Sequence, residues 1–94
     1  MASQELTFNK SGEVWAAEHR VEADFNLHIE KPVGSSVQLY QTTVEGGAWD
    51  PIKEADIKGF EAVADIDFSG IIYPKWIRIE ATDSNITAIV TVND

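Results

Sequence analysis

The chain contains no cysteine among its 94 residues. This absence excludes disulfides, thiolate nucleophiles and thiolate metal ligands together. No apolar run approaches the roughly 20 residues that a membrane-spanning helix needs. The first residues also lack the basic and hydrophobic segments of a secretion signal. We therefore expect a protein that is made in a reducing cytoplasm and is stabilised by packing or assembly.

Basic residues are scarce as well. Lys and Arg number 7 against 16 Asp and Glu, which gives a net charge of −9. This negative field repels phosphate backbones and anionic membrane surfaces, and no stripe of Lys or Arg offsets it locally. We expect neither nucleic-acid nor membrane binding. The apolar share of 44 % is ordinary for a globular chain, so residues 1–94 are predicted to form one folded domain.

The clearest pattern in the sequence is the alternation of apolar and polar side chains from Trp15 to Ile29. Successive side chains on a strand point to opposite faces, so one face of this strand is expected to be buried and the other exposed to solvent. The run is longer than a usual strand of at most about ten residues. The alternation keeps the same phase, which we call its parity, throughout the run. The run therefore either bends from one sheet into the other or turns through a three-residue loop. We favour the bent strand, since no Gly or Pro interrupts it; a short helix over Glu13–Val21 is the alternative.

Similar short alternating segments, separated by turn signals, fill the rest of the chain. This spacing, without a long helical pattern, predicts an all-β fold: an antiparallel β-sandwich, jelly-roll-like, of about eight strands. The predicted strands are Glu5–Phe8, Val14–Ile29, Ser36–Val44, Trp49–Ile57, Phe60–Phe68, Lys75–Thr82 and Ile86–Val92.

Catalytic and metal-binding patterns are weak. His19 lies on the apolar parity of its strand, which is typical of a structural histidine, and no Gly-x-Ser-x-Gly nucleophile elbow accompanies it or His28. The carboxylate pair Asp65 and Asp67 is typical of a solvated sheet face. The segment Asp83–Asn85 is a poor calcium loop and predicts a hairpin turn instead. We expect no enzyme activity, cofactor or metal.

Aromatic residues are the best candidates for binding. Trp15 and Trp49 are expected to be core anchors, whereas Trp76 and Tyr40 lie on the parity opposite the main apolar set of their strands. Val63 and Ile89 are apolar but lie on faces that are expected to be exposed to solvent. This position indicates that they are partly buried against another surface. The candidate binding or interface residues are therefore Trp76, Tyr40, Tyr73, Val63 and Ile89.

Two segments carry a resemblance to a known group of proteins. Val37 to Trp49 reads V-x-L, then Thr-Thr, a Gly-Gly turn and a Trp, and Trp76-Ile77-Arg78-Ile79 follows about thirty residues later, before a closing strand over Ile86–Val92. This order resembles small β-sandwich structural proteins of bacteriophage particles. Glu45-Gly46-Gly47 replaces their usual Asp-Gly turn, and Thr42-Thr43 stands where Ser is common.

The resemblance implies a non-enzymatic virion protein, such as a capsid decoration, head fibre or neck/tail accessory protein, made in the cytoplasm of a bacterial host. Its partners would be other virion proteins and further copies of itself, with a trimer favoured, and Arg78 would pair with acidic residues of neighbouring strands. The alternative function is a carbohydrate-binding module that stacks a glycan on Tyr40, Tyr73 or Trp76.

Overall fold

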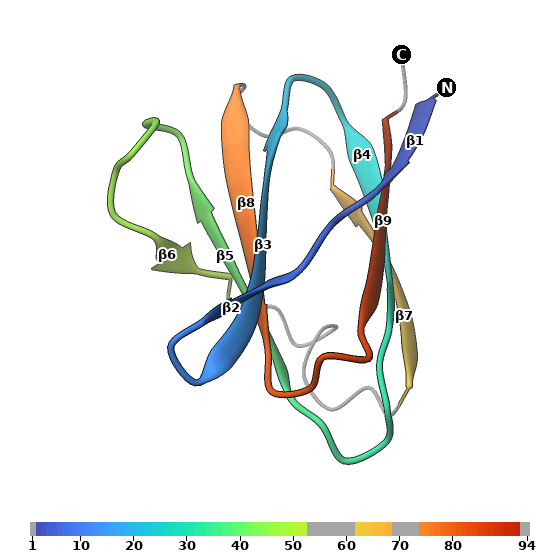
Figure 1. The fold of residues 1–94 in the computed structure, drawn as a ribbon. Helices are drawn as coiled ribbons and strands as arrows, with labels where there is room; N and C mark the ends of the chain where they lie inside the picture. The colour runs from blue at the N-terminus through green and yellow to red at the C-terminus, as the bar shows by residue number, and fades with distance from the viewer. Residues whose placement is uncertain (1, 53–61, 69–73, 93–94) are drawn as a thin grey trace.

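The computed structural model describes residues 2–52, 62–68 and 74–92 and shows an all-β protein (Figure 1). Nine strands lie in this part of the chain. They are β1 (Ala2–Glu5), β2 (Asn9–Ser11), β3 (Val14–Val21), β4 (Phe25–Glu30), β5 (Val37–Thr42), β6 (Asp50–Pro51), β7 (Val63–Phe68), β8 (Lys75–Ala81) and β9 (Thr87–Val92).

The strands form two antiparallel sheets that pack as a sandwich. The four-stranded sheet has the order β1-β9-β4-β7, and the five-stranded sheet has the order β2-β3-β8-β5-β6. Most successive strands therefore lie in different sheets, with β2–β3 and β5–β6 as the consecutive strands that share one, and β1 pairs with β9. Without β2, which extends β3 as a hairpin, this is the order of a jelly roll, so the predicted fold class is confirmed.

The long alternating run supplies strands to both sheets. β3 belongs to the five-stranded sheet and β4 to the four-stranded sheet, as the bend requires. The prediction of one continuous strand is nevertheless wrong, because residues 22–24 interrupt it, and the alternative of a helix is wrong too. An interruption of three residues keeps the parity, so Val21 and Phe25 both point into the core.

One layer of apolar side chains joins the two sheets. Phe25, Leu27 and Ile29 of β4 face Ile77 and Ile79 of β8 across this layer, and none of the five is more than 3 % exposed. Phe25 also stacks on Phe68, with 4.6 Å between the ring centroids. The remaining buried members of the cluster are Leu6, Ala17, Val21, Leu39, Ile52, Ile66, Ala81, Ile86, Ala88 and Val90. Trp15 and Trp49 are only half-buried and lie outside it, so their expected role as core anchors is wrong.

The largest differences from the predicted strands lie near the start and the middle of the chain. Residues 6–8 link β1 to β2 instead of forming a strand, and there Leu6 enters the core while its backbone N–H donates to the carbonyl of Ala88 at 2.8 Å. From the predicted strand Trp49–Ile57, only Asp50–Pro51 is paired; residues 53–57, like Phe60 and Glu61 at the start of another predicted strand, lie outside the described residues.

Two of the predicted turns are present, but only the first of them connects strands that pair with each other. Gly46 adopts φ 73°, a conformation that favours glycine, in the turn between the paired strands β5 and β6. The Asp83–Asn85 turn is closed by the backbone N–H of Asn85, which donates to Asp83 Oδ1 at 2.7 Å. It is no hairpin, however, because β8 and β9 belong to different sheets.

The described part of the chain has no helix long and apolar enough to cross a membrane.

The central strand β8 offers a direct test of this core. Ile79 is fully buried there, so Ile79→Ala should lower the free energy of unfolding by about 2–5 kcal/mol through lost burial and a residual cavity. Val33→Ala, at a position 74 % exposed between β4 and β5, is the control and should change it by less than about 0.5 kcal/mol. Urea unfolding measures both; similar losses would contradict this placement of the core.

Candidate functional site

The outer face of the five-stranded sheet brings two of the predicted binding residues together. Tyr40 of β5 lies opposite Arg78 of β8, and Trp76 lies two positions from Arg78 on the same strand and the same face. Diagonal neighbours of this kind are about 7–8 Å apart, within reach of aromatic side chains. Both rings are half-buried. We call Trp76, Tyr40, Arg20 and Arg78 the aromatic–arginine face.

Arg20 covers part of this face. It lies opposite Trp76 on β3, and its guanidinium is 5.6 Å from the centroid of a Trp76 ring, within the range of a cation–π contact. Its Nη2 atom is also 3.1 Å from Glu22 Oε1, and its side chain is 50 % exposed. Arg20 therefore contacts the Trp76 ring and Glu22 at the protein surface, where a partner molecule could take the place of either contact.

Arg78 is the ionic centre of the same face. Its Nε–H donates to Glu80 Oε2 at 2.8 Å, and its Nη1 donates to Glu18 on the neighbouring strand β3. These carboxylates, Glu80 first, raise the pKa of Arg78 above its already high value. With only 17 % of its side chain exposed, Arg78 is fixed in place. The expectation that Arg78 pairs with acidic neighbours is thus confirmed.

A shallow polar hollow of about 340 Å³ lies beside Arg78, toward the β2–β3 hairpin. Hydroxyl, amide, amine and carboxylate groups around it offer both donors and acceptors to a small polar group. The hollow is lined by Thr7, Asn9, Lys10, Ser11, Ala16, Ala17, Glu18 and Arg78.

The other predicted binding residues do not join the aromatic–arginine face. Val63 lies opposite Glu30, and Ile89 opposite His28, so both are on the outer face of the four-stranded sheet. Val63 is 55 % exposed and Ile89 is half-buried. Tyr73 lies outside the described residues. The alternation placed Val63 and Ile89 on an outer face correctly but did not show that this face belongs to a different sheet from that of Tyr40 and Trp76.

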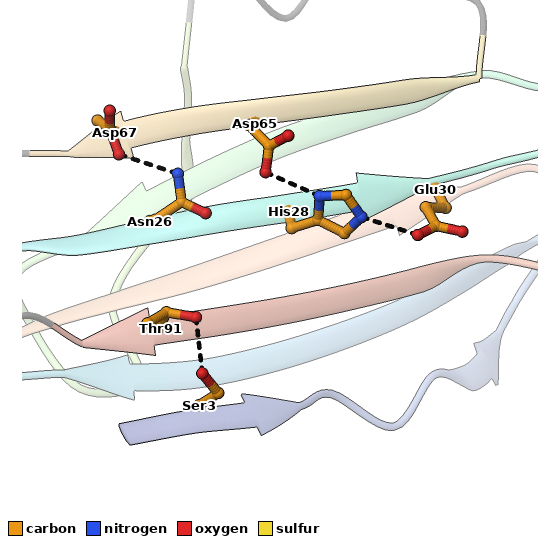
Figure 2. A network of polar contacts seen from close by, with 7 residues as sticks. All are labelled: Ser3, Asn26, His28, Glu30, Asp65, Asp67 and Thr91. Atoms are coloured by element: carbon orange, nitrogen blue, oxygen red, sulfur yellow. Dashed lines mark hydrogen bonds and ion pairs between the residues drawn. The ribbon is translucent and has the colours of Figure 1, made fainter. Parts of the chain in front are cut away.

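The outer face of the four-stranded sheet carries a network of polar side chains (Figure 2). His28 lies between two carboxylates, with Nδ1 2.7 Å from Asp65 Oδ1 and Nε2 2.8 Å from Glu30 Oε2. In the same network Asn26 donates to Asp67 at 2.9 Å, and the Ser3 and Thr91 hydroxyls share a hydrogen bond. The pairing of His28 with Asp65 was not predictable from the alternation, because it depends on the register between β4 and β7.

Two polar residues lie instead on the inner parity of the five-stranded sheet. His19 is half-buried opposite Ile77, and burial lowers its pKa below the ordinary value. Lys75 is buried, donates to the amide oxygen of Gln41, and also has its pKa lowered by burial. Since His28 faces outward on the other sheet, the two imidazoles do not share a site.

Among the described residues, no group of three or more His, Asp or Glu side chains is placed to hold a metal ion. In the His28 network, the two carboxylates bind opposite edges of the ring and so point away from any common ion.

Comparisons of the chain with protein-family models, curated proteins and solved structures found no significant match.

The two arginines of the aromatic–arginine face should differ in their effect on stability. Arg78→Ala removes two hydrogen bonds to carboxylates from a mostly buried position and should lower the free energy of unfolding by about 1.5–3 kcal/mol. Arg20→Ala breaks only exposed contacts and should cost less than about 1 kcal/mol. Urea unfolding of both variants tests this difference, and equal losses would contradict the central role of Arg78.

Proposed function

We propose that this chain is a non-enzymatic structural protein of a bacteriophage particle, a capsid decoration, head fibre or neck/tail accessory protein, that acts through protein–protein contacts. The proposal starts from the resemblance of residues 37–92 to such proteins. It includes synthesis in the cytoplasm of a bacterial host, incorporation into the virion and contact with other virion proteins.

One observation carries the proposal: the two segments of the resemblance form adjacent strands. β5 holds the first part of the first segment, Val37–Thr42, and β8 holds the second segment. The two strands pair with Leu39 opposite Ile79 in the core and Tyr40 opposite Arg78 on the outer face. The shared pattern thus specifies one core and one exposed surface together. Tyr, Trp and Arg, the residue types on that surface, are enriched at protein interfaces and at their energetic centres.

The charge distribution of this face suits contact with another protein. Arg78 is already bound by two carboxylates, Glu18 and Glu80, so burial in an interface would not leave its guanidinium unpaired, and the three groups together keep one net negative charge. Arg20 is more exposed and is available to pair with a carboxylate of a partner. The five-stranded sheet also ends in the short strands β2 and β6. Short edge strands resist pairing with the edge of another sheet. This favours association through the aromatic–arginine face. We propose a homotrimer as the assembled form.

Light scattering across a hundredfold dilution tests self-association. We expect a trimer for the wild type, and Trp76→Ala and Tyr40→Ala should each shift its dissociation to concentrations more than about tenfold higher, as loss of an interface anchor does. Val33→Ala, exposed in a loop away from this face, should leave the mass unchanged. Circular dichroism controls for folding. A monomer at every concentration, or unchanged mass in both aromatic variants, would contradict the proposed homotrimer and its interface.

Glycan binding is the second candidate function, and the polar hollow beside Arg78 favours it. The hollow shares Arg78 with the aromatic–arginine face, so a sugar ring stacked on Trp76 or Tyr40 would lie next to a residue that also borders the hollow. The stacked Arg20 counts against it, since a sugar must first displace that guanidinium from Trp76.

A fluorescence titration distinguishes this second function. Glycan binding predicts saturable quenching of tryptophan emission by an oligosaccharide, with at least about tenfold weaker binding in Tyr40→Ala, as expected for loss of stacking and of contact area worth about 1.4 kcal/mol. Val33→Ala should titrate like the wild type. No response across a broad glycan panel would eliminate the carbohydrate-binding function.

A further inference from the structure

The four-stranded sheet has a single basic side chain on its strands. No Lys or Arg occurs in β1, β4, β7 or β9, and His28 lies near the middle of the outer face (Figure 2). On β9 its neighbours are uncharged, with Ile89 directly opposite. The titratable groups that share this face are Glu5 of β1, Glu30 of β4, and Asp65 and Asp67 of β7.

The two contacts of His28 require both ring nitrogens to donate. Nδ1 is within 2.7 Å of a carboxylate oxygen and Nε2 within 2.8 Å of another. A carboxylate only accepts, and a neutral imidazole has one N–H, whereas an imidazolium has two. Both contacts are therefore hydrogen bonds only when His28 is protonated. In the neutral ring, one nitrogen lone pair faces a carboxylate oxygen.

Arg78 shows the same arrangement with a permanent charge. It binds the carboxylate opposite it on the neighbouring strand, Glu18, and the carboxylate two residues ahead on its own strand, Glu80. His28 likewise binds Asp65 opposite and Glu30 two residues ahead. The two sheets thus use the same kind of side-chain link between neighbouring strands, but only the link through His28 depends on protonation.

We propose that His28 forms a protonation-dependent link between β4 and β7, an edge strand of the described sheet. With the imidazole protonated, Asp65 on β7 and Glu30 on β4 are both bound through the ring. After deprotonation one of these hydrogen bonds is lost and the ring no longer carries a positive charge, so its attraction to Asp65 on β7 weakens and the acidic face loses a compensating cation. The inference is independent of the proposed function.

The direction of the pH effect follows from these contacts. Hydrogen bonds to Glu30 and Asp65 raise the pKa of His28 above its ordinary value of 6.5. A raised pKa in the folded protein means that the stabilisation is complete below pH 6.5 and is lost as the pH rises through the folded pKa. All three side chains are partly exposed, so added salt should weaken the effect.

Nuclear magnetic resonance of the ring nitrogens tests the protonation directly, because the chain has only 2 histidines. The expected result is a His28 pKa above 6.5 that falls in both Asp65→Asn and Glu30→Gln. His19 is the internal control and should titrate below 6.5 in all three proteins. A His28 pKa at or below 6.5, or one unchanged in both variants, would overturn the proposal.

Amide hydrogen exchange tests the mechanical consequence with two substitutions at one position. In the wild type, the protection factors of β7 should fall as the pH rises through the titration of His28. His28→Arg should keep them high at every pH, as Arg78 does for its own strand pair, and His28→Gln should keep them low. The amides of β8 are the control and should not respond. The same pH dependence of the β7 protection factors in all three proteins would overturn the proposed link.

Discussion

The single apolar layer between the two sheets is the constraint on which the rest of the structure depends. Every long strand contributes alternate side chains to it, so the opposite set is fixed on an outer face. The connection from β3 to β4 shows how strict this constraint is. Residues 22–24 carry the chain from one sheet to the other, and their odd number keeps the inward set inward. One residue more or fewer would place the apolar side chains of β4 in solvent.

The outer faces that result have different chemical characters. The five-stranded sheet presents aromatic rings beside two guanidinium groups, and the four-stranded sheet presents carboxylates around one imidazole. In both, a cationic side chain on an internal strand binds one carboxylate across the strand pair and another along its own strand. The first face combines apolar area with permanent positive charges that are each paired with neighbouring carboxylates. The second has a charge that depends on pH.

Much of the fold is predictable from this sequence, because strict alternation shows which side chains turn inward. The strand ends are less predictable: Glu5–Phe8 alternates acceptably, but Leu6 is drawn into the core where the chain crosses between sheets. The candidate binding residues in the described part of the chain were predictable only as outward-facing positions. The grouping of Tyr40 with Trp76, the separation of Val63 and Ile89, and the pairing of His28 with Asp65 all depend on strand order and register, which alternation does not specify.

The pairing of the first strand with the last has a consequence for how the protein is made. β1 pairs with β9, with Ala2 opposite Val92, so the four-stranded sheet is incomplete until the ribosome has added β9. Until then β1 lacks its partner, and β4 lacks its neighbour on the β9 side. Contacts this distant along the chain slow folding and prolong the exposure of unpaired strand edges. Nascent chains should therefore be most vulnerable to misassociation during synthesis, before the finished sandwich protects them.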